Sequence, residues 1–426
     1  MYFCISIRRL TTNHPQLMQS FQKFSSFTSL ILVLVVLSSC VKKSKVEDPI
    51  VVILSLDGFR WDYPTRTATP NLDWMAENGV KAERMIPSFP TTTFANHYTL
   101  ATGLYPDHHG ILVNRFYALD LDAEYNAPGE RETVEDGKFY GGEPIWVTAE
   151  TQQKITATCF WVGSEADVKG VRPTYWKKYD HDMTYSDRID TVMYWLRLPE
   201  EKRPKLVMLY FDEPDSSGHD FGPENDSLMP LITRLDSLIG VFIAKMNTLP
   251  YSDRINFIVV SDHGMAQLSP DRQIVLDQTV DTSLIELVDG WNPTMNIKAK
   301  DGKIDELLEQ LKSIPHLKVW KHGEAPEHLN HSTHIRTHDM TLLAEDGWSI
   351  NWSWMKSYSK GTHGYDFRNT DVNAIFYAVG PDFKSNYAKK PFKNIHVYPL
   401  LAHLLKLKPA PVDGHFDSIS DVLKNY

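Results

Sequence analysis

Short, continuously apolar runs alternate with longer amphipathic segments along most of the chain. Runs of this length that are rich in β-branched residues are typical of strands buried on both faces, as in the parallel sheets of α/β proteins. They cover Ile50–Leu56, Ile155–Val162, Leu206–Phe211, Ile255–Val260 and Ala374–Val379. Helical patterns lie between them, at Asn71–Asn78, Ser227–Met246 and His396–Leu407. This alternation predicts an α/β fold built on a doubly wound sheet, with helices on both faces.

One stretch, from about residue 284 to 348, departs from this alternation. Its pattern predicts a strand, a helix over Lys303–Ile314 and two further strands. We expect a small α+β cap, inserted into one catalytic domain over residues 49–426 and packed against the main sheet. Histidines recur at i, i+3 spacing over His328–His338 and mimic a third metal site, but this run contains no carboxylate or cysteine. We therefore expect it to be a surface loop.

The composition is that of a globular protein and excludes a disordered chain. Of 426 residues, 42% are hydrophobic and 12% aromatic, and the formal net charge is −10. A net-acidic chain without a long basic run argues against a nucleic-acid polymer as a partner, although nucleotides remain open. If a leader containing Cys4 is removed and Cys40 is lipidated, Cys159 is the one free thiol and has no disulfide partner. The apolar run around Cys159 predicts a buried strand residue rather than a reactive thiol.

The apolar run Thr28–Ser39 is too short to span a bilayer and has the length of a signal-peptide core. It ends in Leu-Ser-Ser before Cys40, which resembles a bacterial lipobox, where the leader is removed and the cysteine is lipidated. With Met18 as a possible start, we expect residues 1–39 to be a signal peptide and residues 40–48 to be a lipidated cysteine and its tether. This predicts export to the cell envelope, as a periplasm-facing or outer-membrane lipoprotein that touches the membrane only through its lipid. An ordinary cleaved signal peptide before an unrelated cysteine is the alternative.

Three of the predicted strands end directly in polar side chains of the kind that bind metals. These side chains are Asp57 after the first run, Asp215 with His219 after the third, and Asp262 with His263 after the fourth. Because ligand sites in open α/β sheets lie at the carboxyl ends of strands, these residues should converge in space. A later segment adds His363 between two glycines. Six nitrogen and oxygen ligands without sulfur suit two tetrahedral zinc ions, although Mn²⁺ or Fe²⁺ would accept the same ligands.

The segment Pro87–Gly103 contains three consecutive threonines and lies between the first and second groups of acids. A hydroxyl at the start of a helix is well placed for phosphoryl chemistry, because free backbone N–H groups and the helix dipole stabilise an alkoxide and a phosphate. With this segment, the chain resembles the type I nucleotide pyrophosphatase/phosphodiesterase family of the alkaline phosphatase superfamily. The resemblance runs from Val51 to about Pro381. Its motifs, in the family's order, are Asp57-Gly58, P-T-T-T-F-A-N-H-Y, D-H-H-G-I followed by Asn114, Asp215-x-x-x-His219, D-H-G-M from Asp262, and G-T-H-G-Y-D around His363.

The resemblance implies an alkaline-phosphatase-like fold and a hydrolase with two zinc ions per chain. The implied nucleophile is Thr93. One zinc would be held by Asp215, His219 and His363, and the other by Asp57, Asp262 and His263 together with the Thr93 oxygen. Asn114 would bind phosphate, and Phe94 and Tyr175 would stack on the two faces of a nucleobase. The implied reaction cleaves phosphodiester or pyrophosphate bonds of small nucleotides through a covalent threonine intermediate. It releases nucleoside 5′-monophosphates.

The six metal ligands occur in other branches of the superfamily, so they leave the substrate open. A phosphodiesterase acting on glycerophosphodiesters, lysophospholipids or phosphonates is the main alternative, and a phosphomonoesterase is another. A lipoprotein that binds a nucleotide or glycan without catalysis is disfavoured, because buried carboxylates without a metal are costly. The motifs indicate neither which leaving group is preferred nor the oligomeric state. His97, His108 and His109 are expected to support the nucleophile segment rather than to react.

Overall fold

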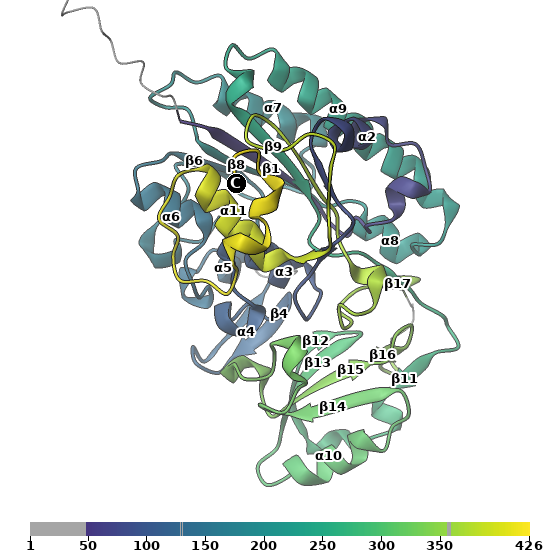
Figure 1. The fold of residues 1–426 in the computed structure, drawn as a ribbon. Coiled ribbons are helices and arrows are strands. Elements are labelled where there is room, and N and C mark those ends of the chain that lie inside the picture. The colour runs from purple at the N-terminus through teal and green to yellow at the C-terminus, as the bar shows by residue number, and fades with distance from the viewer. Residues whose placement is uncertain (1–47, 128, 130, 356–358) are drawn as a thin grey trace, which may run out of the picture. The chain divides into compact units, whose positions relative to one another are not determined.

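The computed structural model describes residues 48–127, 129, 131–355 and 359–426, and an eight-stranded sheet runs through this part of the chain (Figure 1). The predicted signal peptide, Cys40 and, apart from Asp48, the tether lie outside the described residues. The strands in order across the sheet are β19 (Tyr387–Lys389), β2 (Val80–Ala82), β18 (Phe376–Val379), β9 (Ile255–Val260), β1 (Ile50–Leu56), β8 (Leu206–Phe211), β6 (Thr156–Cys159) and β7 (Tyr175–Lys177).

The middle of this sheet is parallel, as the apolar runs predict. β1 pairs in parallel with β8 on one side and with β9 on the other, and all three have the predicted bounds. β18, however, runs antiparallel to β9, so the sheet is mixed. An apolar run indicates that a strand is buried on both faces, but it does not indicate the direction of the strand. The sequence therefore could not distinguish β18 from its neighbours.

Helices cover both faces of the sheet, which confirms the predicted doubly wound arrangement. Alternate residues of β1 belong to different cores: Val52 packs with α2 (Pro70–Asn78), α7 (Tyr185–Leu196) and α9 (Met229–Asn247), and Ile53 packs with α3, α6 and α11. The remaining helices are α3 (Thr93–Thr102), α4 (Pro106–His109), α5 (Arg131–Val134), α6 (Ile145–Thr151), α8 (Asp215–Phe221), α10 (Ile304–Lys312) and α11 (Val397–Leu404). Successive strand residues point to opposite faces, so each face receives an apolar layer.

The helical run Asp226–Asn247 is long and apolar enough to cross a membrane by length and composition alone. Its side chains Ile232, Leu235 and Ile239 are fully buried against the sheet. These contacts make α9 a core helix of the α/β fold.

Cys159 is the last residue of β6 and is a buried free thiol, as predicted. Burial raises the pKa of the Cys159 thiol to about 12. The thiolate, which is the reactive form, is therefore negligible near neutral pH.

A second, four-stranded antiparallel sheet forms from residues 285–344, and we call it the cap sheet (Figure 1). Its strands in order are β12 (Ile285–Trp291), β13 (Thr294–Ala299), β15 (Met340–Ala344) and β14 (Leu317–Lys321). Two strands precede α10 where the sequence pattern indicated one, because β12 and β13 form a hairpin. Small two-stranded pairs complete the strands: β3 (Met85–Ile86) with β20 (Phe392–Lys393), β4 (Arg115–Ala118) with β5 (Ala123–Asn126), β10 (Ala266–Gln267) with β17 (Gly361–Thr362), and β11 (Gln273–Val275) with β16 (Ser349–Asn351).

The histidine-rich run 328–338 is not the surface loop that its polarity suggested. His331, Arg336 and His338 are buried. The Arg336 guanidinium donates two hydrogen bonds of 2.8 Å to the Asp120 carboxylate, and further ones to the carbonyls of Gly110 (2.8 Å) and Phe139 (2.7 Å). The polar groups of the run 328–338 are buried because they form hydrogen bonds with the main domain. This run therefore connects the cap sheet to α4 and its surroundings.

Candidate active site

The carboxyl ends of β8, β1 and β9 carry the acidic side chains of the site. Because the three strands are adjacent and parallel, the chain leaves all of them at the same edge of the sheet. Two groups of side chains there have ligand atoms within 4.8 Å of one another. They are Asp57 with Asp262 and His263, and Asp215 with His263 and His363.

The first group is almost fully buried. The Nε2 of His263 lies 3.0 Å from Oδ2 of Asp262 and 3.5 Å from Oδ1 of Asp57. The other oxygen of each carboxylate is held by the fold: the Tyr210 hydroxyl donates to Oδ2 of Asp57 (2.6 Å), and the Gly58 N–H donates to Oδ1 of Asp262 (3.1 Å). Gly58 has φ +67°, and a Cβ there would lie 2.9 Å from the Asp215 Cα, so the site requires glycine.

The second group is built on α8. Asp215 and His219 lie one helical turn apart, with His219 Nε2 3.5 Å from Asp215 Oδ2. His363 approaches from the loop after β17 and places its Nε2 3.4 Å from Asp215 Oδ1. Its ring stacks on that of His263 with 3.7 Å between centroids. The tightest group thus contains His263 in place of His219, so His263 lies between the two groups.

The three imidazoles present the same nitrogen to the site. Nδ1 of His219, His263 and His363 lies 2.8 Å, 2.8 Å and 2.9 Å from a backbone carbonyl oxygen, that of Gly361, Gly264 and Thr91 respectively. A carbonyl only accepts, so each Nδ1 carries the proton and each Nε2 offers a lone pair. This is how metal-binding histidines are oriented in proteins.

The carboxylates also indicate a metal site. Among the described residues, Oδ1 of Asp215 and Oδ2 of Asp262 are buried without a hydrogen-bond partner, which is costly for a charged oxygen. Burial and the nearby charges of Asp262 and Asp215 raise the pKa of Asp57 well above its usual value. Burial, followed by the neighbouring His263 and His219, lowers the pKa of His363 well below its usual value. Lone pairs and buried anions that face one another without a donor are what a divalent cation satisfies, so these residues fit a metal centre.

Thr93 is the first residue of α3 and faces this cluster. Its Oγ1 lies 3.2 Å from Nε2 of His263 and 3.5 Å from Oδ1 of Asp57. The turn before α3 is fixed by the fully buried Asn96, whose amide donates to three backbone carbonyls, those of Ser88 (3.1 Å), Pro90 (3.0 Å) and Thr92 (3.0 Å). Asn96 was not predicted from the sequence, although its place one turn after Thr92 could have indicated this role.

Comparison with known proteins shows which family the chain belongs to. The family model for type I phosphodiesterase / nucleotide pyrophosphatase matches residues 51–366. The chain belongs to this family. Human ectonucleotide pyrophosphatase/phosphodiesterase family member 5 is 32% identical over 378 residues, which cover 88% of this chain and 78% of the human protein. A venom phosphodiesterase from Naja atra is 34% identical over 88% of this chain, which spans about half (46%) of the venom protein.

A solved structure gives the same result. The inactive threonine-to-alanine variant of the murine family member 5, in complex with AMP, matches with a TM-score of 0.85 at 33% identity. The match covers 89% of this chain and 100% of the murine one. It confirms the alkaline-phosphatase-like α/β fold. Members of the type I family are metal-dependent hydrolases of phosphodiester and pyrophosphate bonds, so the chain is an enzyme of that class.

In this phosphodiesterase-family chain, Asn114 lies beside the start of α3. Its Oδ1 accepts a hydrogen bond of 3.1 Å from the backbone N–H of Phe94. With the carbonyl oxygen used in this way, the two amide N–H groups are left to donate. The side chain therefore offers hydrogen-bond donors beside the helix N-terminus.

His97 lies one turn after Thr93 and is fully buried. Its Nδ1 is 2.9 Å from the Thr93 carbonyl oxygen and 3.3 Å from Oδ2 of Asp262, and its Nε2 is 2.9 Å from the Ser55 hydroxyl. The ring thus links α3 to a carboxylate of the site. This agrees with the supporting role expected for it.

A cavity of about 160 Å³ opens on the Phe94 side of Thr93. Its aromatic walls include Phe94, Trp161, Tyr179 and Tyr210. Its lining also contains a buried carboxylate, Glu165, which forms an ion pair with Arg131. An aromatic slot of this kind suits a flat ring.

Tyr175, the predicted partner of Phe94, does not line this cavity. It is the first residue of β7, opposite Ala157. Its ring stacks on Trp195 with 6.2 Å between centroids, and its hydroxyl donates to the carbonyl of Lys202 (3.1 Å). Tyr179, two residues beyond the end of β7, reaches the cavity instead. Tyr175 lies at the amino end of a parallel strand, so it is at the opposite edge of the sheet from the carboxyl ends that carry the acidic side chains. The structure thus separates Tyr175 from the cavity that Phe94 lines.

Proposed function

We propose that the chain is a two-zinc hydrolase that cleaves phosphodiester or pyrophosphate bonds of small nucleotides and releases nucleoside 5′-monophosphates. The observation that carries the proposal is the position of Thr93, at the helix N-terminus and within 3.5 Å of Asp57 and His263. Asp57, Asp262, His263 and the Thr93 oxygen would hold one ion, and Asp215, His219 and His363 the other. Bound there, two divalent ions would lower the pKa of the Thr93 hydroxyl and offset charge on the phosphoryl oxygens.

The residues of the chain divide the chemistry between them. The Thr93 Oγ1 attacks phosphorus in line, a bond from phosphorus to the threonine oxygen forms, and the leaving oxygen departs with its electron pair. The amide of Asn114, whose Oδ1 accepts from the Phe94 N–H, and the remaining backbone N–H groups at the start of α3 donate to the phosphoryl oxygens. Water then displaces Thr93 from the covalent phosphothreonine diester. The inactivity of the murine threonine-to-alanine variant supports a threonine nucleophile.

The aromatic cavity supports a nucleotide substrate. Phe94 and Tyr179 would contact opposite faces of the nucleobase, and stacking of this kind contributes ~1–3 kcal/mol per base. The murine relative binds AMP, which agrees with this proposal. A glycerophosphodiester, lysophospholipid or phosphonate would leave both rings without a flat partner, so we favour a nucleotide over these alternatives.

We further propose that the protein is exported through a signal peptide over residues 1–39 and lipidated on Cys40, facing the periplasm or held at the outer membrane. Relatives that are named as ecto-enzymes and venom enzymes support export. Lipid labelling of the wild type and of Cys40→Ala in the native host tests the anchor. Loss of the label only in the variant supports lipidation, and an unlabelled wild type contradicts it.

An assay on the p-nitrophenyl ester of thymidine monophosphate tests the activity. The zinc-loaded domain should prefer this ester by about tenfold or more over bis-p-nitrophenyl phosphate and p-nitrophenyl phosphate, a difference of ~1.4 kcal/mol. EDTA should abolish turnover and added zinc restore it. Equal or better turnover of the monoester would instead indicate a phosphatase.

A further inference from the structure

The consecutive threonines at the start of α3 have different surroundings. Thr93 faces the metal-type residues, whereas Thr91 is fully buried and contacts a distant part of the chain. The Thr91 Oγ1 accepts a hydrogen bond of 2.8 Å from the Gly364 N–H and donates one of 3.1 Å to the Tyr365 carbonyl. The proton of this hydroxyl and one of its lone pairs are thus used by the segment 363–365.

The backbone of Thr91 also holds the His363 ring. The Thr91 carbonyl accepts a hydrogen bond of 2.9 Å from His363 Nδ1, and the other ring nitrogen, Nε2, lies 3.4 Å from Oδ1 of Asp215. Thr91 therefore makes three hydrogen bonds to the segment 363–365, although 272 positions separate it from His363. Because Thr91 precedes Thr93 by two positions, it connects the proposed nucleophile to a proposed metal ligand.

The position of Thr91 is itself fixed by the fold. The Asn96 amide donates to the carbonyls of Pro90 (3.0 Å) and Thr92 (3.0 Å), which lie on either side of Thr91. The Pro90 carbonyl also accepts a hydrogen bond of 2.8 Å from the Thr92 N–H. Thr91 therefore presents its hydroxyl and its carbonyl from a turn whose backbone is held on both sides.

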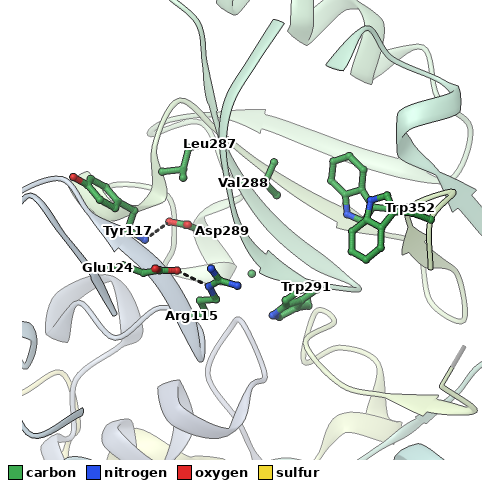
Figure 2. Close-up of a pocket in the computed structure, with 10 residues that line it drawn as sticks. Arg115, Tyr117, Glu124, Leu287, Val288, Asp289, Trp291 and Trp352 are labelled. Carbon is green, nitrogen blue, oxygen red and sulfur yellow. Dashed lines mark hydrogen bonds and ion pairs between the residues drawn. The ribbon is translucent and has the colours of Figure 1, made fainter. Parts of the chain in front are cut away.

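The cap sheet holds Gly364 through a different group. Thr294, the first residue of β13, donates a hydrogen bond of 2.6 Å to the Gly364 carbonyl. β13 pairs with β12, and Asp289 of β12 accepts a hydrogen bond of 2.8 Å from the Tyr117 N–H of β4 (Figure 2). The Gly364 carbonyl is thus bound to a hairpin that is joined to the main domain, and the Gly364 N–H is bound to Thr91.

We propose that Thr91 is a positioning residue, which fixes the His363 Nε2 at the metal site relative to the Thr93 hydroxyl. The inference rests on the proposed function, in which His363 is a zinc ligand. Without the Thr91 hydroxyl, the Gly364 N–H and the Tyr365 carbonyl lose the hydrogen bonds that connect them to the nucleophile. Groups that orient a ligand in this way typically contribute about 10–100-fold to metal affinity.

Zinc bound per full-length chain, measured over a buffered series of free zinc, tests this. Thr91→Val keeps the shape of the side chain and removes the hydroxyl. It should weaken one zinc site by about 10–100-fold, so the variant holds one ion at zinc concentrations where the wild type holds two. Thr91→Ala removes the same hydroxyl and is the second variant. Thr91→Ser restores the hydroxyl and should recover most of the affinity. Thr92→Val is the matched control and should keep the wild-type affinity, because the Thr92 hydroxyl has no hydrogen-bond partner among the described residues.

A double-mutant cycle separates an effect through His363 from general damage to the fold. In a His363→Ala background, Thr91→Val should weaken zinc binding no further, because the ligand that Thr91 positions is absent. An equal loss in the two backgrounds would overturn the proposal. Wild-type zinc affinity in both Thr91→Val and Thr91→Ala would overturn it as well. A wild type that binds fewer than two zinc ions would instead overturn the proposed function, and this inference with it.

Discussion

The Tyr210 hydroxyl donates a hydrogen bond of 2.6 Å to Oδ2 of Asp57, from the strand next to it. Burial, and then the charge of Asp57, raise the pKa of Tyr210 well above its usual value, so the phenol stays protonated and donates. With Oδ2 occupied, Oδ1 of Asp57 faces Thr93 and His263. Tyr210 therefore fixes the orientation of a proposed metal ligand without contacting the metal position itself.

Tyr210→Phe should weaken metal binding at this site by about 10–100-fold, the usual effect of removing a group that orients a ligand. The ring and its packing stay, so the thermal stability of the metal-free protein should change little. Titration against a buffered zinc series, with zinc bound per chain as readout, measures the effect. Wild-type affinity in the variant would show that Asp57 keeps its orientation without the phenol.

Thr93→Ala should abolish turnover of the nucleotide ester while zinc per chain stays close to that of the wild type. The reason is that the carboxylates and imidazoles remain, and only one oxygen is lost. Zinc content by mass spectrometry and kcat on the same preparation separate the two effects. Thr93→Ser should recover part of the activity, because it restores a hydroxyl at the helix start. Activity of Thr93→Ala near that of the wild type would exclude Thr93 as nucleophile.

The sequence was sufficient to predict that Asp57, Asp215 and Asp262 lie close together, because one local rule applies to these three residues. Asp57 and Asp262 each follow a continuously apolar run, and parallel strands end at one edge. The same rule would have selected Tyr179 over Tyr175, since Tyr179 lies just beyond the carboxyl end of β7 and Tyr175 lies at its amino end. β7 has only three residues and no apolar run, so its end could not be located from the pattern.

Other features depend on long-range pairing and leave no local signal. The run 328–338 is polar, but Arg336 is buried because Asp120 and two carbonyls more than 190 positions earlier accept its protons. The antiparallel direction of β18 is likewise set by where the chain returns to the sheet after the cap. Hydrophobicity indicates which residues are buried, but it specifies neither the hydrogen-bond partner of a buried polar group nor the direction of a strand.

Replacing either ring of the proposed nucleobase cavity should raise KM for the nucleotide ester. Phe94→Ala and Tyr179→Ala should each cost ~1–3 kcal/mol in kcat/KM for that ester, and much less for bis-p-nitrophenyl phosphate, which has no base. Tyr175→Ala is the matched control, because Tyr175 packs on Trp195 outside the cavity. An effect of Tyr175→Ala confined to the nucleotide ester would restore the original assignment, and equal losses on both substrates would indicate damage to the fold.

His109 provides a pH dependence of stability that is separate from the metal ligands. Burial lowers the pKa of His109 from 6.5 to about 3. Its Nδ1 accepts from the Ile111 N–H (3.2 Å), so its Nε2 carries the single proton and faces the Thr99 hydroxyl (3.0 Å). The unfolded chain takes up a second proton below about pH 6.5 and the folded chain does not. The free energy of unfolding should therefore fall as pH falls from about 6.5 toward 3, with His109 contributing a loss of about 2 kcal/mol between pH 7 and pH 5.

Denaturant titrations at pH 7 and pH 5, in excess EDTA, measure this contribution. His109→Gln removes the titrating group, so its loss of stability between the two pH values should be smaller than that of the wild type by about 2 kcal/mol. Comparison of two pH values cancels any constant destabilisation that glutamine introduces at the buried position. If His109→Gln lost as much stability as the wild type, the acid sensitivity would belong to other buried groups.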